Sequence, residues 1–161
     1  MSSKKPLVLV AAEAPLRAKP TSPPFPAEMV ARVAAGRDKQ PLGDLFGLTN
    51  FGVNLTRLAP GGQSALRHAH GKQDEFVYLL EGEAVLITDA GETALTAGMC
   101  AGFKAGTGDA HHLVNRSEKD VVFLEVGDRS AGDTVVYPDD DVAAVYSDGR
   151  FTHTRKDGTP L

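Results

Sequence analysis

The sequence has only one cysteine, Cys100, among its 161 residues. An intrachain disulfide is therefore excluded, a reducing cytoplasm is the expected location, and we expect the thiol to be a small buried hydrophobe in a strand. Long apolar runs are also missing, because the stretch 7–12 is short and is followed by Glu13 and Pro15. We therefore expect neither a membrane-spanning segment nor a secretory signal.

An excess of positive charge is missing too, since the formal net charge is −4. The chain has no basic stripe and no helix-turn-helix region, so we expect no nucleic-acid partner. We find no phosphate loop of the Walker type, no dinucleotide-binding glycine fingerprint and no serine or cysteine nucleophile motif. These absences remove several large classes of enzyme and leave a small-molecule ligand as the expected partner.

The pattern that is present is one of short strands. From Phe51 onward, stretches rich in β-branched and aromatic residues recur about every eight to twelve residues, and turns with glycine separate them. This spacing predicts an all-β sandwich or barrel rather than an α/β fold. A short helix is expected at 27–35 before Gly36, whereas 41–46 is ambiguous.

Composition divides the chain into three parts within a single domain. Residues 1–45 comprise a proline-rich arm and short connecting elements, residues 46–130 carry the barrel strands, and residues 131–161 form a less regular C-terminal extension. Proline prevents regular strand pairing in the arm. Both flanks exceed what a bare barrel needs, so we expect the extension to pack on the barrel or on a partner subunit.

Two histidines, His68 and His70, stand two residues apart in a predicted strand, 64–70. Alternate residues of a strand point to the same face, so the two imidazoles should project side by side. Glu75 has the wrong parity for the same strand, and the loop 71–74 is expected to reset the parity before a second strand begins. Imidazole and carboxylate together suit a divalent ion such as Zn, Fe, Mn, Ni or Co.

The surrounding residues match a known pattern, G-x5-H-x-H-x4-E-x6-G, at Gly62, His68, His70, Glu75 and Gly82. The pattern resembles the first motif of the cupin superfamily. The segment 98–115 resembles the second cupin motif, with the expected residues at Gly98, Gly106, His111 and Asn115. It departs from that motif at Lys104, where proline is usual, and in the loop after Gly106, which is longer than the commonest form.

This resemblance implies a double-stranded β-helix, the jelly-roll barrel of cupins, with extended N- and C-terminal flanks. It also implies that one divalent metal ion, such as Zn, Fe, Mn or Ni, is held by His68, His70, Glu75 and His111. Strand parity allows only one of His111 and His112 to point inward, and the motif selects His111. Asn115 could line the pocket or bond to the backbone.

Such a ligand set would leave two adjacent positions of a six-coordinate ion open to a bidentate oxygen ligand. We therefore expect a metal-dependent enzyme that acts on a small oxygen-rich metabolite. Isomerase-like chemistry on a sugar or sugar phosphate competes with Fe(II)-type dioxygenase chemistry. A cupin that binds a small molecule without turnover is the alternative of another class.

The overall layout resembles a group of small bacterial cupins that are often labelled sugar-phosphate isomerases. In small cupins the flanks often cover a second subunit, so we expect a homodimer. The sequence identifies no catalytic base. The cations nearest the motifs, which an anionic substrate group would need, are Arg57, Arg67 and Lys104, and parity directs Arg67 away from His68.

Overall fold

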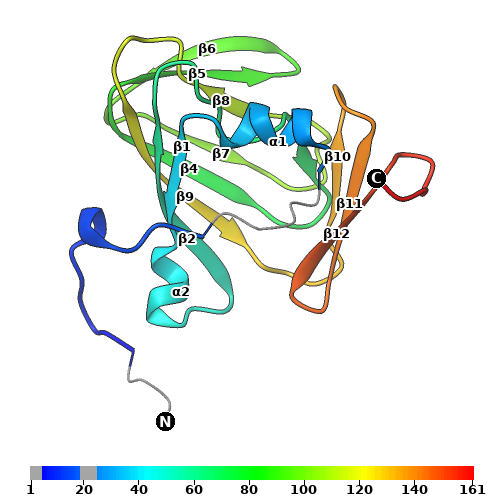
Figure 1. Ribbon diagram of the computed structural model, residues 1–161, viewed down its shortest axis with the longest axis horizontal. Helices are drawn as coiled ribbons and strands as arrows, with labels where there is room; N and C mark the ends of the chain where they lie inside the picture. Colours follow the sequence, from blue (N-terminus) through cyan, green and yellow to red (C-terminus); the bar gives the residue numbers. More distant parts are fainter. Residues whose placement is uncertain (1–4, 19–24) are drawn as a thin grey trace.

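The computed structural model describes residues 5–18 and 25–161, and antiparallel strands dominate it (Figure 1). Parts of the predicted proline-rich arm, 1–4 and 19–24, lie outside the described residues. The helical elements are η1 (Ala11–Glu13), α1 (Ala27–Ala34) and α2 (Leu42–Phe46). The strands are β1 (Arg37–Gln40), β2 (Phe51–Leu58), β3 (Ala69–His70), β4 (Glu75–Glu81), β5 (Glu83–Thr88), β6 (Gly91–Thr96), β7 (Cys100–Phe103), β8 (His112–Val114), β9 (Val121–Asp128), β10 (Thr134–Tyr137), β11 (Val142–Ser147) and β12 (Arg150–Thr154).

Two of the sheets form the barrel. One has the strand order β1-β2-β9-β4-β7 and the other the order β6-β5-β8. Their inner faces enclose the main core, whose largest fully buried members include Phe123, Leu58 and Leu79. The alternation of buried and exposed residues along β4 shows why its sequence forms a strand with one face inward. The predicted all-β jelly-roll fold is confirmed.

A further sheet, of order β12-β11-β10-β3, joins the C-terminal extension to the histidine segment. In it, Val135 pairs with His70, and Val136 pairs with Ala69. The helix α1 packs against this sheet through Val33, beside β10 and β11 (Figure 1). The extension therefore packs on the barrel of its own chain and reaches the predicted ligands.

The segment before His70 differs from the predicted strand, because β3 contains only two residues. Side chains bond to the backbone carbonyl groups that would otherwise accept hydrogen bonds from a neighbouring strand. The carbonyl of Ser64 accepts a hydrogen bond from Arg37, that of Ala65 lies 3.1 Å from Nδ1 of His112, and that of Leu66 lies 2.8 Å from Nδ1 of His68. The segment is consequently a series of bends, and isolated β-bridges join it to the segment around β8, at Gln63 with Val114 and at His68 with His111.

Three other local predictions have clear outcomes. The short helix before Gly36 is confirmed as α1, and the ambiguous stretch 41–46 contains α2. The prediction that Cys100 is buried was wrong, because the thiol is exposed. Cys100 pairs with Tyr78 across β7 and β4, and both side chains lie on the outer face of the sheet. In the described residues, no helix is long and apolar enough to cross a membrane.

Candidate metal centre

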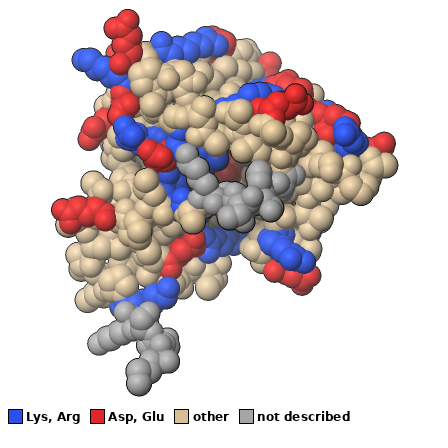
Figure 2. Space-filling view, in the orientation of Figure 1, with Lys and Arg blue, Asp and Glu red and all other residues tan. Residues whose placement is uncertain are grey.

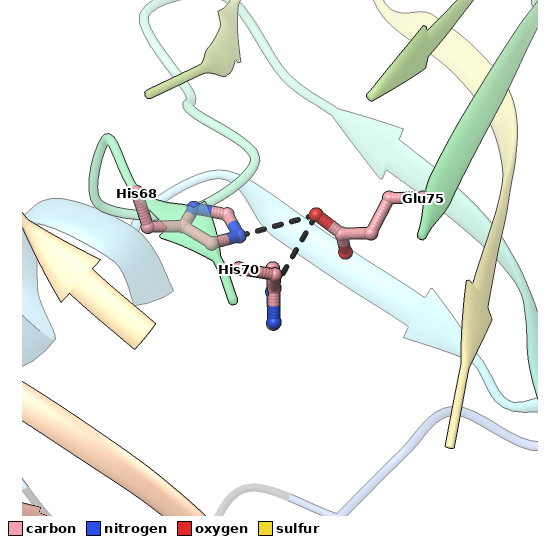
Figure 3. Close-up of side chains that lie close together, drawn as sticks. All are labelled: His68, His70 and Glu75. Carbon is pink, nitrogen blue, oxygen red and sulfur yellow. Dashed lines mark ion pairs between the residues drawn. The ribbon is translucent and has the colours of Figure 1, made fainter. Parts of the chain in front are cut away.

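Three predicted ligands meet beside the start of β4 (Figure 3). The ligand-capable atoms of His68, His70 and Glu75 all lie within 4.8 Å of one another. One carboxylate oxygen of Glu75, Oε2, is 3.4 Å from Nε2 of His68 and 3.5 Å from Nε2 of His70. The loop after β3 resets the strand parity as expected, since Glu75 begins β4 and points back toward the two imidazoles (Figure 3).

Glycine is required in this loop. The backbone N–H of Gly71 donates to the carbonyl of Thr134 at 2.7 Å. A Cβ atom at Gly71 would lie 2.5 Å from Oγ1 of Thr134, which is closer than real contacts allow. The absence of a side chain thus lets β10 approach the loop and hold it against the ligand residues.

His111 joins the same group from the segment that leads into β8. Its Nε2 atom lies 3.0 Å from Oε2 of Glu75, the oxygen that also faces the other two histidines. Its backbone exchanges hydrogen bonds with that of His68, and its ring stacks on Phe103 with centroids 3.5 Å apart. The neighbouring His112 instead directs Nδ1 to the carbonyl of Ala65. The structure therefore brings His111, and not His112, to the carboxylate.

Two of the imidazoles are oriented by acceptors behind them. Nδ1 of His68 lies 2.8 Å from the carbonyl of Leu66, and Nδ1 of His70 lies 2.5 Å from Oδ2 of Asp133. Carbonyl and carboxylate oxygens only accept, so each Nδ1 carries a proton and each Nε2 is the ring atom that faces Glu75. Acceptors of this kind typically fix the tautomer of metal-binding histidines.

Sequence reasoning missed Asp133. This fully buried residue precedes β10, and its second oxygen, Oδ1, accepts hydrogen bonds from the backbone N–H groups of Lys72 and Gln73 at 2.7 and 3.2 Å. No spacing links it to the histidine motif, because it lies in the C-terminal extension. The only sequence signal was the expectation that this extension packs on the barrel.

The charges of the site favour an ionised carboxylate. Burial alone would raise the pKa of Glu75, but hydrogen bonds and charge interactions with His111 and His68 outweigh burial and hold that pKa well below its usual value. Burial likewise lowers the pKa of the His68 imidazole, but the hydrogen bond and the charge of Glu75 outweigh burial, so the pKa is raised overall. Three imidazole nitrogens around one ionised carboxylate form a donor set that fits a borderline divalent ion. Among the described residues, the buried Nδ1 of His111 has no partner, whereas Nε2 faces Glu75, which fits a ring that presents Nε2 to an ion.

A cavity of about 670 Å³ adjoins these four side chains. Tyr137 forms part of its wall, with a ring centroid 6.0 Å from that of His68. Burial, with the nearby charges of Glu75 and Asp133, raises the pKa of the Tyr137 hydroxyl, so the phenol stays neutral. The inner wall also carries the carboxylate of Glu125, which accepts a hydrogen bond from Asn54 at 2.9 Å and pairs with Lys39.

The cations expected beside the site lie elsewhere. Arg57 pairs with Asp38 at 3.0 Å and with Asp120 on the outer surface. Arg67 points away from the cavity, as parity predicted, and pairs with Asp139 at 2.8 Å. Lys104 borders a second, much smaller space. The cations that line the large cavity are Arg17, Arg37, Lys39 and Arg129.

Asn115 has a structural role and is not among the residues that line the described cavity. Its amide nitrogen donates to the carbonyls of Leu58 at 2.9 Å and Lys119 at 2.7 Å. Its amide oxygen accepts from the backbone N–H and the hydroxyl of Ser117 at 3.0 and 2.8 Å. Of the two roles considered for Asn115, the geometry is that of a backbone clamp for the turn before β9.

Comparison with known proteins places these features in a family. Residues 54–127 match the family model described as a cupin domain. A crystal structure from Silicibacter pomeroyi, described as a sugar phosphate isomerase from a cupin superfamily, is 42% identical, covers 96% of each chain and has a TM-score of 0.87.

A structure from Acidithiobacillus ferrooxidans, whose assignment as a sugar phosphate isomerase is provisional, is 25% identical over 85% of this chain and 94% of its own, with a TM-score of 0.70. A predicted oxalate decarboxylase from Thermotoga maritima, 19% identical over 76% of this chain and 98% of its own, shares the fold with a TM-score of 0.59. No curated protein matches the sequence.

Proposed function

The chain belongs to the cupin superfamily, and from this premise we propose that it is a metal-dependent isomerase acting on a sugar phosphate or a similar small oxygen-rich molecule. The observation that carries the proposal is the convergence of His68, His70 and His111 on one oxygen of Glu75 beside a large cavity. The Silicibacter relative, with its description as a sugar phosphate isomerase, supports the choice of reaction.

The four convergent side chains would hold one divalent ion. When bound, such an ion supplies a Lewis acid that polarises a carbonyl and lowers the pKa of an adjacent hydroxyl. The acceptors behind His68 and His70 engage Nδ1 of each ring and leave Nε2 as the atom that would bind the ion. The neutral Tyr137 phenol lies beside His68 on the cavity wall, where it can donate a hydrogen bond to a substrate oxygen.

An isomerase also needs a group that moves protons. In an aldose–ketose isomerisation, a proton leaves C2 and returns to C1, while another moves from O2 to O1. Glu125 is the carboxylate that we assign to the carbon-bound proton. It pairs across the sheet with Val77, two residues from Glu75 on the same inward face of β4, so both carboxylates line the cavity. Lys39 and Asn54 hold its position.

Metal content and turnover together test this function. We expect the purified protein to contain about one divalent ion per chain by elemental analysis. It should also exchange deuterium into a pentose or hexose phosphate in D2O, as followed by proton NMR. His70→Ala should lose both properties. The matched control is His112→Ala, which removes a neighbouring imidazole that does not face Glu75.

A metal-loaded protein that exchanges no proton would contradict the isomerase, and metal bound equally by His70→Ala would contradict the ligand set. Oxygen uptake with catechol-type substrates under air tests the dioxygenase alternative. Tight ligand binding without turnover would identify the non-catalytic binding module instead.

We also propose that the protein is a homodimer in the cytoplasm. The outer face of β4 exposes Phe76, Tyr78 and Leu80 at 40, 39 and 40%. Leu7, in the N-terminal arm, is 94% exposed. Contiguous exposed apolar residues usually mark a protein–protein interface, and a second copy of this chain would cover them.

A further inference from the structure

The strand β1 supplies two cations to the cavity. It pairs with β2 so that Arg37 lies opposite Leu58 and Lys39 lies opposite Thr56, and both partners are fully buried. The residue between them, Asp38, lies opposite Arg57 and forms an ion pair with it on the outer surface. Alternate residues of a strand share a face, so Arg37 and Lys39 both point inward.

Of the cations that line the cavity, Arg37 has no counter-ion within the part of the chain that the structure describes. Its guanidinium donates to the carbonyl of Ser64, and no carboxylate of the described residues forms an ion pair with it. By contrast, Lys39 pairs with Glu125, and Arg129 pairs with Asp44 at 2.5 Å. A partly buried cation without an anion is unfavourable, because it has lost water without gaining a partner.

The electrostatics agree with this description. Burial lowers the pKa of Arg37. The charge of Glu125 raises it and the charge of Arg17 lowers it, and the pKa stays below its usual value. Arg17 itself lines the cavity, where it bonds to Asn54 at 3.0 Å and makes only a 3.7 Å contact with Asp44. Lys and Arg atoms border the hollow at the centre of the face shown in Figure 2.

We propose that Arg37, assisted by Arg17, binds the phosphate group of the substrate while the histidine and glutamate cluster binds its carbonyl or hydroxyl oxygens. The inference rests on the proposed function for the rest of the substrate. A guanidinium has five N–H donors in a planar fork that matches a phosphate monoester bidentately, and a phosphate would supply the anion that Arg37 lacks.

The two ends share one chamber. Both Arg37 and the metal-site residues line the same cavity. A volume of about 670 Å³ is within the range of cavities that hold small ligands. A substrate held at both ends would therefore have its reacting carbons between the cluster and Arg37, on the wall that carries Glu125.

The test is a calorimetric titration of the full-length, metal-loaded protein with inorganic phosphate and, separately, with acetate. We expect phosphate to bind the wild type, and Arg37→Gln to weaken that binding about tenfold or more. Arg57→Gln is the control, because it removes an equal charge from the adjacent strand but faces outward. Arg37→Lys, which keeps the charge but loses the fork, should bind with intermediate affinity and covers the case in which Arg37→Gln does not fold.

His70→Ala separates this site from the metal. If phosphate binds Arg37 rather than the ion, His70→Ala should still bind it. Equal binding by wild type and both Arg37 variants, loss of binding in His70→Ala alone, or no binding by the wild type would each overturn the inference. Acetate binding as tight as phosphate would overturn the assignment to phosphate. The protein could bind phosphate through Arg37 as expected and still not turn over sugar phosphates. That result would count against the proposed function and not against this phosphate site.

Discussion

Nδ1 of His70 lies 2.5 Å from a carboxylate oxygen of Asp133, although 63 residues separate them in the sequence. The other oxygen of Asp133 holds the loop that carries Lys72 and Gln73. One buried carboxylate thus sets both the tautomer of a proposed ligand and the path of the chain to the next one. The C-terminal extension is therefore part of the site.

Replacing Asp133 by asparagine should weaken metal binding with little change in shape. The amide can still accept from the loop through its oxygen, but its NH2 group would face Nδ1 of His70 and favour the wrong tautomer. We expect metal affinity to fall about 10- to 100-fold in a chelator competition assay. Asp141→Asn, an exposed carboxylate on the same extension that pairs with Arg155 at 3.2 Å, should leave the affinity unchanged. Equal losses in the two variants would argue against an orienting role.

Glu125→Gln should separate turnover from metal binding. Glutamine keeps the size of the side chain but cannot take up the carbon-bound proton, so we expect kcat for isomerisation to fall about 10²- to 10⁴-fold. Metal content by elemental analysis should stay at the wild-type value, since Glu125 is not among the convergent ligands. The exposed Glu92→Gln, whose partner is Arg116, serves as the control. A variant with unchanged kcat would remove Glu125 from the mechanism.

The pair formed by Asp139 and Arg67 predicts a small acid dependence of stability. The hydrogen bond from Arg67 holds the pKa of Asp139 below its usual value in the folded protein. A depressed folded pKa stabilises the fold above the unfolded pKa, and this contribution disappears as the pH falls through the folded value. The side chain of Asp139 is 51% exposed, so water screens the interaction. We therefore expect the pair to contribute less than about 1 kcal/mol to the free energy of unfolding.

Asp139→Asn should therefore unfold at slightly lower denaturant concentration than wild type near neutral pH. The difference should vanish once the pH is below the depressed pKa of Asp139. Urea unfolding at several pH values measures it, and a difference that grew toward acid pH would contradict a depressed pKa for this carboxyl.

Tyr78→Glu should break the proposed homodimer. A carboxylate in the middle of the outer face of β4 would be desolvated against the second copy, so we expect monomers by light scattering after size-exclusion chromatography. Val145→Glu makes a similar change at a residue that is 49% exposed on another sheet and should leave the dimer intact. A wild-type protein that is monomeric at all concentrations would contradict the proposed homodimer.

The parts of the site that strand parity and motif spacing describe could be predicted. His68, His70 and Glu75 belong to one continuous stretch, and the parity reset in the loop between them follows from the sequence alone. The same reasoning placed the strands of the barrel, because each buries one face and alternates accordingly.

What lay beyond prediction depends on contacts between distant segments. β1 has the polar sequence Arg-Asp-Lys-Gln, which shows no strand propensity, and it forms because β2 offers an open edge. For this reason the cations of the cavity wall, Arg37 and Lys39, were missed, and cations near the motifs were named instead. Asp133 was missed for the same reason, since only the folded extension brings it to His70.

The bends before β3 have a consequence for how this scaffold can diverge. Side chains of Arg37, His112 and His68 hold the carbonyls of 64–66, where a sheet partner would be expected. A strand can move a ligand only by slipping its whole register, which would turn every neighbouring side chain over. The bends before β3 do not carry this constraint, so the length of the segment 64–67 can change during evolution without turning over a strand of either barrel sheet.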